Sequence, residues 1–427
     1  MIRYGEALGL LLEAGARVRL GAEEIPVDGA CGRVAAEAAR APGPLPRFDN
    51  SAMDGYAVAA SRTAGACGRR PLRLPVAGRI AAGDAPIGSP RPGFAWEIMT
   101  GAPMPAGCDA VARVEDVEPV DGGNGVLLKA PVASGDFVRS RGADLEARAE
   151  LLPAGSRIGA AQVMILAAAG LGTVRARRRP RVAVIATGRE LVAPGREAGP
   201  GRVHDGSSAF LAAALGGLGA ELVRRERVAD EPAAFAAAFA SALAQEPELV
   251  VTTGAVSKGR FDFVAGTLAE AGCRTVFHGV AIRPGKPLLA AQLRDGPLVL
   301  GLPGNPVSTI VGLRFFGAPL LRAWLGLPAE RPLRAPLARA VEKPAGLRCF
   351  FQARLEAEAG RLSARVLAGQ ASFQVLPLAE ANAWVALPEP GEALPARTDV
   401  DAFPWLPQDP PLPSAARLPR RSARCRP

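Results

Sequence analysis

The stretch from Leu249 to Phe263, LVVTTGAVSKGRFDF, constrains the fold of this chain more than any other. It opens with an apolar run rich in β-branched residues, which is typical of a strand buried on both faces of a parallel sheet. The run gives way to a loop with Gly254, Gly259, hydroxyl side chains, cations and Asp262. Open α/β sheets bind ligands beyond the carboxyl ends of their strands. The stretch therefore predicts either a ligand-binding loop or an ordinary polar turn of the same composition.

The neighbouring sequence extends this pattern over residues 180–327. Strands are expected at 181–186, 221–227, 249–252, 275–280, 288–293 and 298–302, and helices at 208–218, 232–244, 263–271 and 309–325. Strands that alternate with helices form a mainly parallel sheet covered on both faces. The sequence thus predicts a central αβα domain.

Two further regions have short strands separated by Gly- and Pro-rich turns, the pattern of small β domains. One spans residues 45–144 and the other spans residues 328–406. Residues 407–427 are rich in Pro and Arg and are expected to be a disordered tail.

The remaining segments, 1–44 and 145–179, flank the first β domain. Apolar residues at helical spacing predict an opening helix at 4–20, a second helix at 26–40 and a buried helix at 160–169. We expect these helices to pack together as a discontinuous helical linker domain, with the β domain inserted between its halves.

Composition narrows the functional classes. The net charge is +10, but aromatic residues are only 5%, too few for base-stacking platforms, so we expect no nucleic-acid partner. Two His and six scattered Cys give no zinc-ligand spacing, and single thiols fit a reducing cytoplasm. No uncharged apolar stretch is long enough to span a membrane, and the N-terminus does not resemble a signal peptide. The charge suits small anionic substrates.

Four loops of the αβα domain are expected at one edge of its sheet: 187–190, 253–262, 282–287 and 303–308. They combine Gly-rich backbone, hydroxyls, the cations Arg283 and Lys286, and the carboxylates Glu190 and Asp262. Helix N-termini behind such loops attract phosphate, and carboxylates beside phosphate commonly hold Mg²⁺. Neither a Walker A sequence nor a dinucleotide fingerprint is present. The loops predict a phosphate-bearing organic ligand with a divalent metal.

The inserted β domain contains a second set of polar motifs. The segment 49–55 holds Asp49, Asn50, Ser51 and Asp54 within six residues, which is more polar chemistry than a turn needs. Thr100 directly follows an expected strand, so its hydroxyl could face a ligand. Asp54 could instead act only as a turn cap.

These motifs carry a resemblance to a known family. They are Asp49-Asn50-Ser51-Ala52-Met53-Asp54-Gly55-Tyr56-Ala57, Thr100-Gly101-Ala102-Pro103-Met104-Pro105, Arg141-Gly142-Ala143-Asp144, Thr187-Gly188-Arg189-Glu190-Leu191, Pro284-Gly285-Lys286-Pro287 and Leu302-Pro303-Gly304-Asn305-Pro306. With these motifs in this order, the chain resembles the molybdopterin molybdenumtransferases, a family that includes MoeA and the E domain of gephyrin. Each motif alone is weak, but the ordered set is specific.

The resemblance implies an L-shaped homodimer whose active site is shared between subunits. It implies insertion of molybdate into adenylylated molybdopterin, with Mg²⁺ present and AMP released. Candidate protein partners are a molybdopterin adenylyltransferase and molybdoenzyme acceptors. Tungstate-selective insertion, adenylyl transfer itself and a non-catalytic scaffold of the same fold remain open alternatives.

The chemistry of the loops and the resemblance together assign site residues. Catalytic roles fall to Asp54, Thr100, Asp144, Glu190 and Lys286. Substrate binding falls to Arg139, Thr187, Gly188, Asp230, Thr253, Gly254, Ser257, Asp262, Arg283, Pro303, Gly304, Asn305 and Ser308, and metal binding to Glu190 and Asp262. Arg139 and Asp144 could instead pair with each other, and Ser308 could only cap its helix. The chain departs from the usual family pattern at Ala255, Lys258, Arg260, Arg283 and the segment His204-Asp205-Gly206-Ser207.

Overall fold

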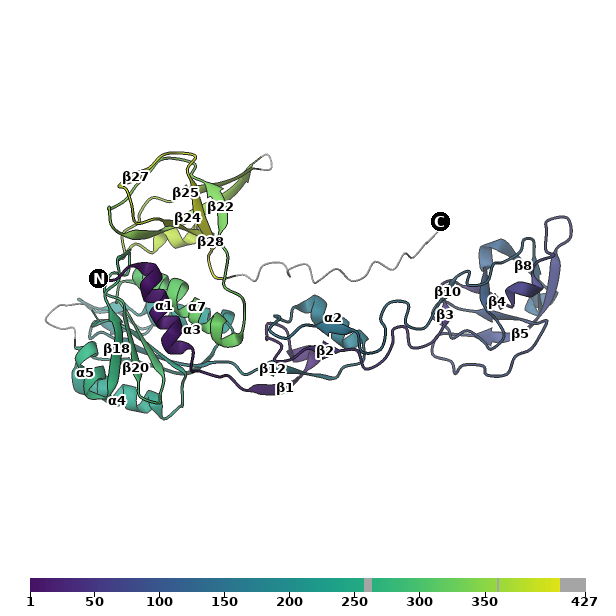
Figure 1. Cartoon of the computed structure of the whole chain (residues 1–427), viewed down its shortest axis with the longest axis horizontal. Coiled ribbons are helices and arrows are strands. Elements are labelled where there is room, and N and C mark those ends of the chain that lie inside the picture. The colour runs from purple at the N-terminus through teal and green to yellow at the C-terminus, as the bar shows by residue number, and fades with distance from the viewer. Residues whose placement is uncertain (257–262, 359–360, 408–427) are drawn as a thin grey trace.

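In the computed structural model the chain is elongated and L-shaped, as expected (Figure 1). The structure describes residues 1–256, 263–358 and 361–407, so the expected tail lies almost wholly outside the described residues. The α/β domain and the C-terminal β domain form one broad lobe. The inserted β domain lies at the far end of a narrow linker.

The α/β domain is built on a six-stranded sheet in the order β16-β13-β17-β21-β20-β18. Its strands are β13 (Arg181–Thr187), β16 (Glu221–Val228), β17 (Leu249–Thr253), β18 (Cys273–His278), β20 (Leu289–Leu293) and β21 (Leu298–Leu302). Because only β20 runs against the other strands of this sheet, the mainly parallel prediction is confirmed.

Helices cover both faces of the sheet. They are α3 (Gly206–Gly217), α4 (Pro232–Leu243), α5 (Val264–Glu270), α6 (Pro306–Gly312) and α7 (Ala318–Leu325). Side chains alternate along β13, so Val184 packs in the core with α3, α6 and α7, whereas Ile185 packs in the core with α4 and α5. The helix predicted at 309–325 is interrupted by a π-helical turn at Leu313–Gly317.

The N-terminal helix α1 (Tyr4–Gly15) does not pack in the linker as expected. Ala7 and Leu11 are fully buried in the core that also contains α7. The Trp324 indole N–H donates to the Gly15 carbonyl oxygen at 2.8 Å. The apolar stripe of α1 is therefore buried against the α/β domain, and its predicted place in the linker is wrong.

The linker consists mainly of short antiparallel strands and contains one α-helix, α2 (Ala160–Ala168). Its strands are β1 (Ala22–Pro26), β2 (Ala39–Arg40), β11 (Glu150–Leu152) and β12 (Thr173–Arg177). The helix predicted at 26–40 is wrong, because this backbone pairs with the returning chain: the Ala36 N–H donates to the Arg175 carbonyl at 2.9 Å. Helix α2 is also more exposed than predicted, with Met164 74% exposed.

The inserted domain has a six-stranded sheet in the order β7-β4-β6-β5-β9-β8 and a two-stranded sheet of β3 and β10. Its strands are β3 (Asn50–Ser51), β4 (Gly55–Val58), β5 (Leu72–Ile80), β6 (Ala95–Ile98), β7 (Ala110–Arg113), β8 (Val117–Val120), β9 (Gly125–Leu128) and β10 (Val138–Arg139). A side chain at Gly55 would meet the Ala112 carbonyl oxygen at 2.0 Å, which is why β4 begins with glycine. The predicted all-β character of this domain is confirmed.

The C-terminal domain continues into the α/β domain through a shared sheet. Its strands are β19 (Ile282–Arg283), β22 (Leu333–Pro336), β23 (Val341–Glu342), β24 (Arg348–Glu358), β25 (Arg361–Val366), β26 (Ala383–Leu387), β27 (Ala393–Leu394) and β28 (Asp399–Pro404). Strand β19 comes from the α/β domain and pairs with β24. Arg314, 1% exposed, forms two hydrogen bonds of 2.8 Å with Glu330 and contacts the Pro404 carbonyl. These contacts fix the C-terminal domain beside the site loops.

Candidate functional site

The carboxyl ends of β13, β17 and β21 bring three of the predicted loops together. The Gly254 N–H donates to the Leu302 carbonyl at 3.1 Å. A side chain at Gly254 would lie 2.3 Å from the Thr187 carbonyl oxygen, and one at Gly304 would lie 3.5 Å from the Gly254 Cα. Gly254 has a φ of +88°, which favours glycine. The three loops therefore form one surface, and glycine is needed for their close approach.

Hydroxyl groups lie directly beneath this surface. Thr187 and Thr252 are buried at the ends of β13 and β17, and their Oγ1 atoms form no hydrogen bond within the described residues. Thr253 is also buried. Buried polar groups normally have a partner, so unpaired hydroxyls beside a Gly-rich loop are candidates to contact a ligand.

Two carboxylates follow β13 and β16. Asp230 accepts a hydrogen bond from the Arg189 N–H at 3.0 Å. Both carboxylate oxygens of Glu190 would lie 3.0 Å from a side chain at Gly188, so only glycine leaves that carboxylate uncovered. These contacts place Gly188, Glu190 and Asp230 in one cluster.

The loop between β18 and β20 supplies the cations. Arg283 and Lys286 are exposed and form no ion pair within the described part of the chain. Gly285 has a φ of +107° and approaches Ile282 and the Ser308 carbonyl oxygen. This contact joins the cationic loop to the loop that follows β21.

That last loop leads into α6. Asn305 is the N-cap residue and Pro306 begins the helix, while Ser308 is buried in the first turn. The capping alternative for Ser308 is therefore wrong. The Thr309 hydroxyl donates to the Pro303 carbonyl at 2.8 Å, which holds the turn from Pro303 to Asn305 against the helix.

The inserted domain contains the second group of predicted residues. The exposed Asp54 carboxylate accepts the Thr100 backbone N–H at 2.7 Å and the Thr100 hydroxyl at 2.8 Å. These hydrogen bonds, the backbone one foremost, lower the pKa of Asp54 below its usual value. Asp54 therefore contacts a distant motif and does not merely cap its own turn.

Arg139 and Asp144 lie in the same domain and are both exposed. Arg139 pairs through its backbone with Asn50 in the β3–β10 ribbon. No ion pair joins Arg139 to Asp144 among the residues described, which removes the pairing alternative.

One chain does not bring the two groups together. The inserted domain and the α/β domain lie at opposite ends of the molecule (Figure 1). The structure thus joins the α/β loops but leaves the Asp54 group far away. Ser257 and Asp262 lie outside the described residues.

Sequence reasoning missed one buried acid next to the site. Asp205 is 1% exposed, caps α3 and accepts hydrogen bonds from Ser208 and Arg227. The signal was available, because Asp directly before a helical run is typical of an N-cap, whose carboxylate accepts a backbone N–H of the first turn. The Asp205 N–H also donates to the Val192 carbonyl at 2.9 Å, which ties the chain after β15 (Val203–His204) to β14 (Leu191–Val192).

The α/β edge supplies some, but not all, of the oxygen ligands that a hard divalent cation needs. No group of three or more His, Cys, Asp or Glu that could hold a metal occurs within the described residues. Glu190 supplies an exposed carboxylate without an ion-pair partner in that part of the chain, which is an oxygen donor of the kind Mg²⁺ prefers.

Sequence profiles match nearly the whole chain. Residues 2–170 match the MoeA N-terminal region (domains I and II), residues 183–323 match a probable molybdopterin binding domain, and residues 334–405 match the MoeA C-terminal region (domain IV). The three matches follow the division into inserted domain with linker, α/β domain and C-terminal domain.

Individual proteins agree. A molybdopterin molybdenumtransferase of Synechococcus elongatus is 41% identical and covers 94% of this chain and 99% of its own length. Molybdopterin molybdenumtransferase 2 of Mycobacterium tuberculosis is 38% identical over 86% of this chain and 90% of its own. A crystal structure of a molybdopterin biosynthesis MoeA protein from Pyrococcus horikoshii has a TM-score of 0.79 and 32% identity, covering 94% of this chain and 99% of that chain.

Proposed function

This chain belongs to the MoeA family of molybdopterin molybdenumtransferases, and we propose how its two separated groups of residues carry out that reaction. The protein is a transferase of molybdenum cofactor biosynthesis that acts on molybdopterin and molybdate. In the proposed reaction, molybdate is inserted into the dithiolene of adenylylated molybdopterin and AMP is released.

The active site is shared between two copies of the chain. The observation that carries this proposal is the distance between the Asp54 group and the α/β loops in one chain (Figure 1). Asp54, Thr100, Arg139 and Asp144 therefore cannot reach a ligand bound at the α/β loops of the same chain. A homodimer in which the inserted domain of one copy lies over the α/β edge of the other completes the site.

The α/β edge binds the charged parts of the substrate. Arg283 and Lys286 neutralise phosphate or oxyanion charge, because neither is committed to an ion pair in the described part of the chain. The buried Thr187 hydroxyl, which has no hydrogen-bond partner within the described residues, and the Thr253 hydroxyl donate to phosphate oxygens beside the glycine-rich loops. These groups orient the nucleotide end.

The inserted domain contributes a charged side chain to the reacting centre. The hydrogen bonds from Thr100 lower the pKa of Asp54 and so favour its ionised form, which can orient a proton-bearing ligand such as water. Arg139 and Asp144, which are exposed in the same domain, are the other residues that this domain contributes to the site. Glu190, together with Asp262 from the loop outside the described residues, would hold Mg²⁺, which when bound offsets phosphate charge.

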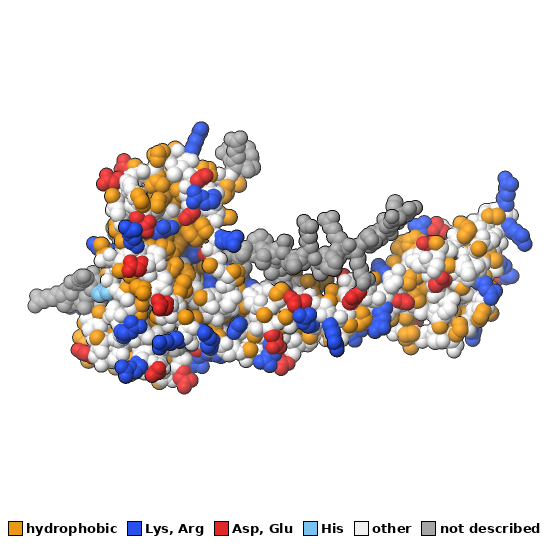
Figure 2. All heavy atoms as spheres, viewed as in Figure 1, with side chains coloured by type: hydrophobic (Ala, Val, Ile, Leu, Met, Phe, Trp, Pro, Cys, Tyr) orange, Lys and Arg blue, Asp and Glu red, His pale blue; other side chains and the backbone are white. Residues whose placement is uncertain are grey.

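We place the enzyme in the cytoplasm. Cys31, Cys67, Cys108, Cys273 and Cys349 are all free thiols, which suits a reducing compartment. No helix of the described chain is long and apolar enough to cross a membrane. Basic and acidic side chains are interspersed over the face in view in Figure 2. A molybdopterin adenylyltransferase and molybdoenzyme acceptors are the proposed protein partners.

The proposal is tested with purified protein, adenylylated molybdopterin, Mg²⁺ and either molybdate or tungstate. We expect AMP release with molybdate, dependent on Asp54 and Lys286. Faster release with tungstate identifies a tungsten enzyme, and formation of the adenylylated compound from molybdopterin and ATP identifies adenylyl transfer. If Asp54→Ala and Glu190→Ala leave cofactor synthesis unchanged, the chain is a scaffold and the proposal is wrong.

A further inference from the structure

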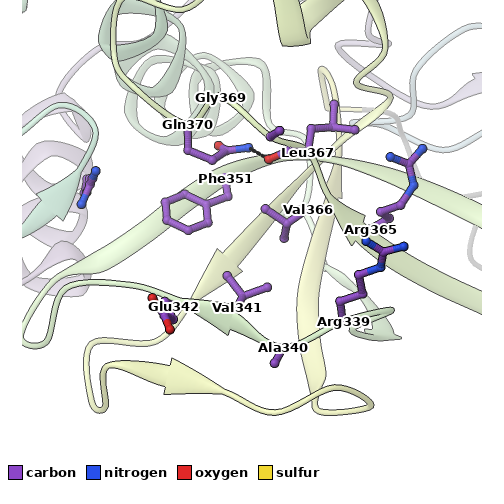
Figure 3. Close-up of a pocket in the computed structure, with 12 residues that line it drawn as sticks. Arg339, Ala340, Val341, Glu342, Phe351, Arg365, Val366, Leu367, Gly369 and Gln370 are labelled. Atoms are coloured by element: carbon purple, nitrogen blue, oxygen red, sulfur yellow. Dashed lines mark hydrogen bonds between the residues drawn. The ribbon is translucent and has the colours of Figure 1, made fainter.

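The structure contains a pocket that the proposed reaction does not use. One pocket, of about 400 Å³, includes Arg283 and therefore belongs to the site already described; Arg339 and Arg365 lie side by side on its wall (Figure 3). A second pocket, of about 90 Å³, lies in the inserted domain. The residues that line this second pocket include none of the site residues described above.

This second pocket lies at the opposite end of β4 from Asp54. Asp54 directly precedes the strand, and Ala59, which lines the pocket, directly follows it. A strand rises about 3.3 Å per residue, so the two positions are roughly 16 Å apart. A ligand held in this pocket therefore leaves Asp54 open to the reaction.

The pocket is formed by backbone that packs closely. The Ala106 N–H donates to the Ile87 carbonyl at 2.9 Å, which joins the segment before β7 to the segment before β6. A side chain at Gly107 would lie 2.9 Å from the Pro90 Cβ, and Gly107 has a φ of +85°. Gly107 and Pro90 both line the pocket, so its shape is set before any ligand enters.

The charge of the pocket is positive. Arg62 and Arg91 line it, and neither forms an ion pair within the described residues. No acidic side chain is among its described lining residues. The nearby Asp109 carboxylate lies outside the lining and already accepts the Ala60 N–H at 2.7 Å and the Ser134 hydroxyl at 2.6 Å. The two guanidinium groups are therefore available to bind a carboxylate.

The floor of the pocket is apolar and small. It is formed by Ala59, Leu74 and Cys108. Burial, with a smaller effect of Asp109, raises the pKa of Cys108 to about 11, so the thiol is neutral and does not repel an anion. A volume of about 90 Å³ is the space of about three water molecules. It accommodates a carboxylate with one or two methylene groups, but no larger organic molecule.

We propose that this pocket is a docking point for an acidic segment of a partner protein, which inserts a Glu or Asp side chain. Arg62 and Arg91 bind the carboxylate, and the apolar floor covers the methylene groups. Phe94, which is 38% exposed and also lines the pocket, contacts the adjoining part of the partner. Small-molecule sites enclose most of their ligand, which this pocket is too small to do. The inference goes beyond the proposed function, because the partner is held away from Asp54.

The test uses fluorescein-labelled hexaglutamate as a probe, titrated with the full-length protein and followed by fluorescence anisotropy. We expect saturable binding that Arg62→Gln and Arg91→Gln each weaken about tenfold, since each change removes a charge-assisted hydrogen bond. Cys108→Leu should weaken binding similarly without a change of charge, because the larger side chain fills the floor. Arg69→Gln is the matched control: Arg69 is exposed in the same domain, has no ion pair among the described residues and does not line the pocket.

Thermal unfolding shows which variants are folded, and only folded variants are compared. Equal binding by wild-type protein and the Arg62→Gln, Arg91→Gln and Cys108→Leu variants overturns the proposal. An equal loss in Arg69→Gln also overturns it, because the probe would then respond to the general charge of the domain. Displacement of the probe by acetate at the same concentration of carboxylate groups assigns the pocket to a small free acid and rejects a protein partner. AMP release should be unchanged in both arginine variants, and a loss there would contradict a docking site separate from the reaction.

Discussion

The α/β edge and the tip of the inserted domain present site residues by different means. At the α/β edge the loops are positioned by buried parallel strands, and Gly254 lies so close to the Thr187 carbonyl that no side chain fits. In the inserted domain the exposed Asp54 is oriented by hydrogen bonds from a single neighbour, Thr100. The position of the site residues at the α/β edge therefore depends on close packing of the backbone, whereas the role of Asp54 in the inserted domain depends on its charge.

The largest effect is expected from a change of shape at the α/β edge. Gly254→Ala adds a Cβ 2.3 Å from the Thr187 carbonyl at a φ of +88°. We expect a loss of stability of about 2 kcal/mol or more, because both the left-handed backbone and the steric overlap are unfavourable for alanine. AMP release should fall with it, as the loops separate. Urea unfolding and the release assay measure the two effects.

Gly216→Ala is the control for this change. Gly216 lies in α3 with no atom near its missing side chain, so alanine should be neutral or stabilise the protein by up to about 1 kcal/mol. If Gly254→Ala behaves like Gly216→Ala, the α/β edge does not depend on close approach of its loops.

A change of charge at the inserted domain should act on the reaction alone. Asp54→Asn keeps the shape of an exposed side chain but removes its charge. We expect AMP release to fall by about 10² to 10³-fold, the usual loss when one preorganised polar group is removed, with the unfolding midpoint unchanged. Asp116→Asn, in the same domain but paired with Arg113, should retain full activity. Equal activity of the two variants would show that Asp54 has no part in the reaction.

The smallest effect is expected from the support of Asp54. Thr100→Val removes the hydroxyl donor and keeps the backbone N–H, which is the larger cause of the lowered pKa. The pKa of Asp54 should rise toward its ordinary value. Because a lowered pKa means that the ionised form is lost only as the pH falls through it, the acid limb of AMP release should move to higher pH.

Carbon NMR of the Asp54 carboxyl, or the pH profile of AMP release, measures this shift. Thr100→Ser keeps a hydroxyl and should restore the wild-type profile. A profile that Thr100→Val leaves unmoved contradicts the assigned hydrogen-bond effect.

Much of the α/β edge could be predicted from the sequence. Strands such as β17 are apolar on both faces and therefore stand out as short β-branched runs followed by Gly-rich loops. The carboxyl ends of parallel strands share an edge, so their loops could be brought together without coordinates.

Features set by distant pairing could not be predicted. Residues 26–40 contain helix-forming residues, but apart from one short turn at Val27–Gly29 most of their backbone hydrogen bonds go to residues more than a hundred positions away. Helix α1 likewise packs against a distant segment of the chain, α7, and not against the linker. The pocket with Arg339 and Arg365 depends on which strands neighbour β24, which no local pattern reveals.

The central claim is that the two regions meet only between subunits. Mixing Asp54→Asn protein with Lys286→Ala protein, after dissociation and reassociation, tests it directly. Each mixed dimer should contain one site with both wild-type residues, and half of the dimers should be mixed. AMP release should therefore return to about a quarter of the wild-type value, although each variant alone is inactive. If the mixture is as inactive as its components, both residues act within one chain and the shared site is wrong.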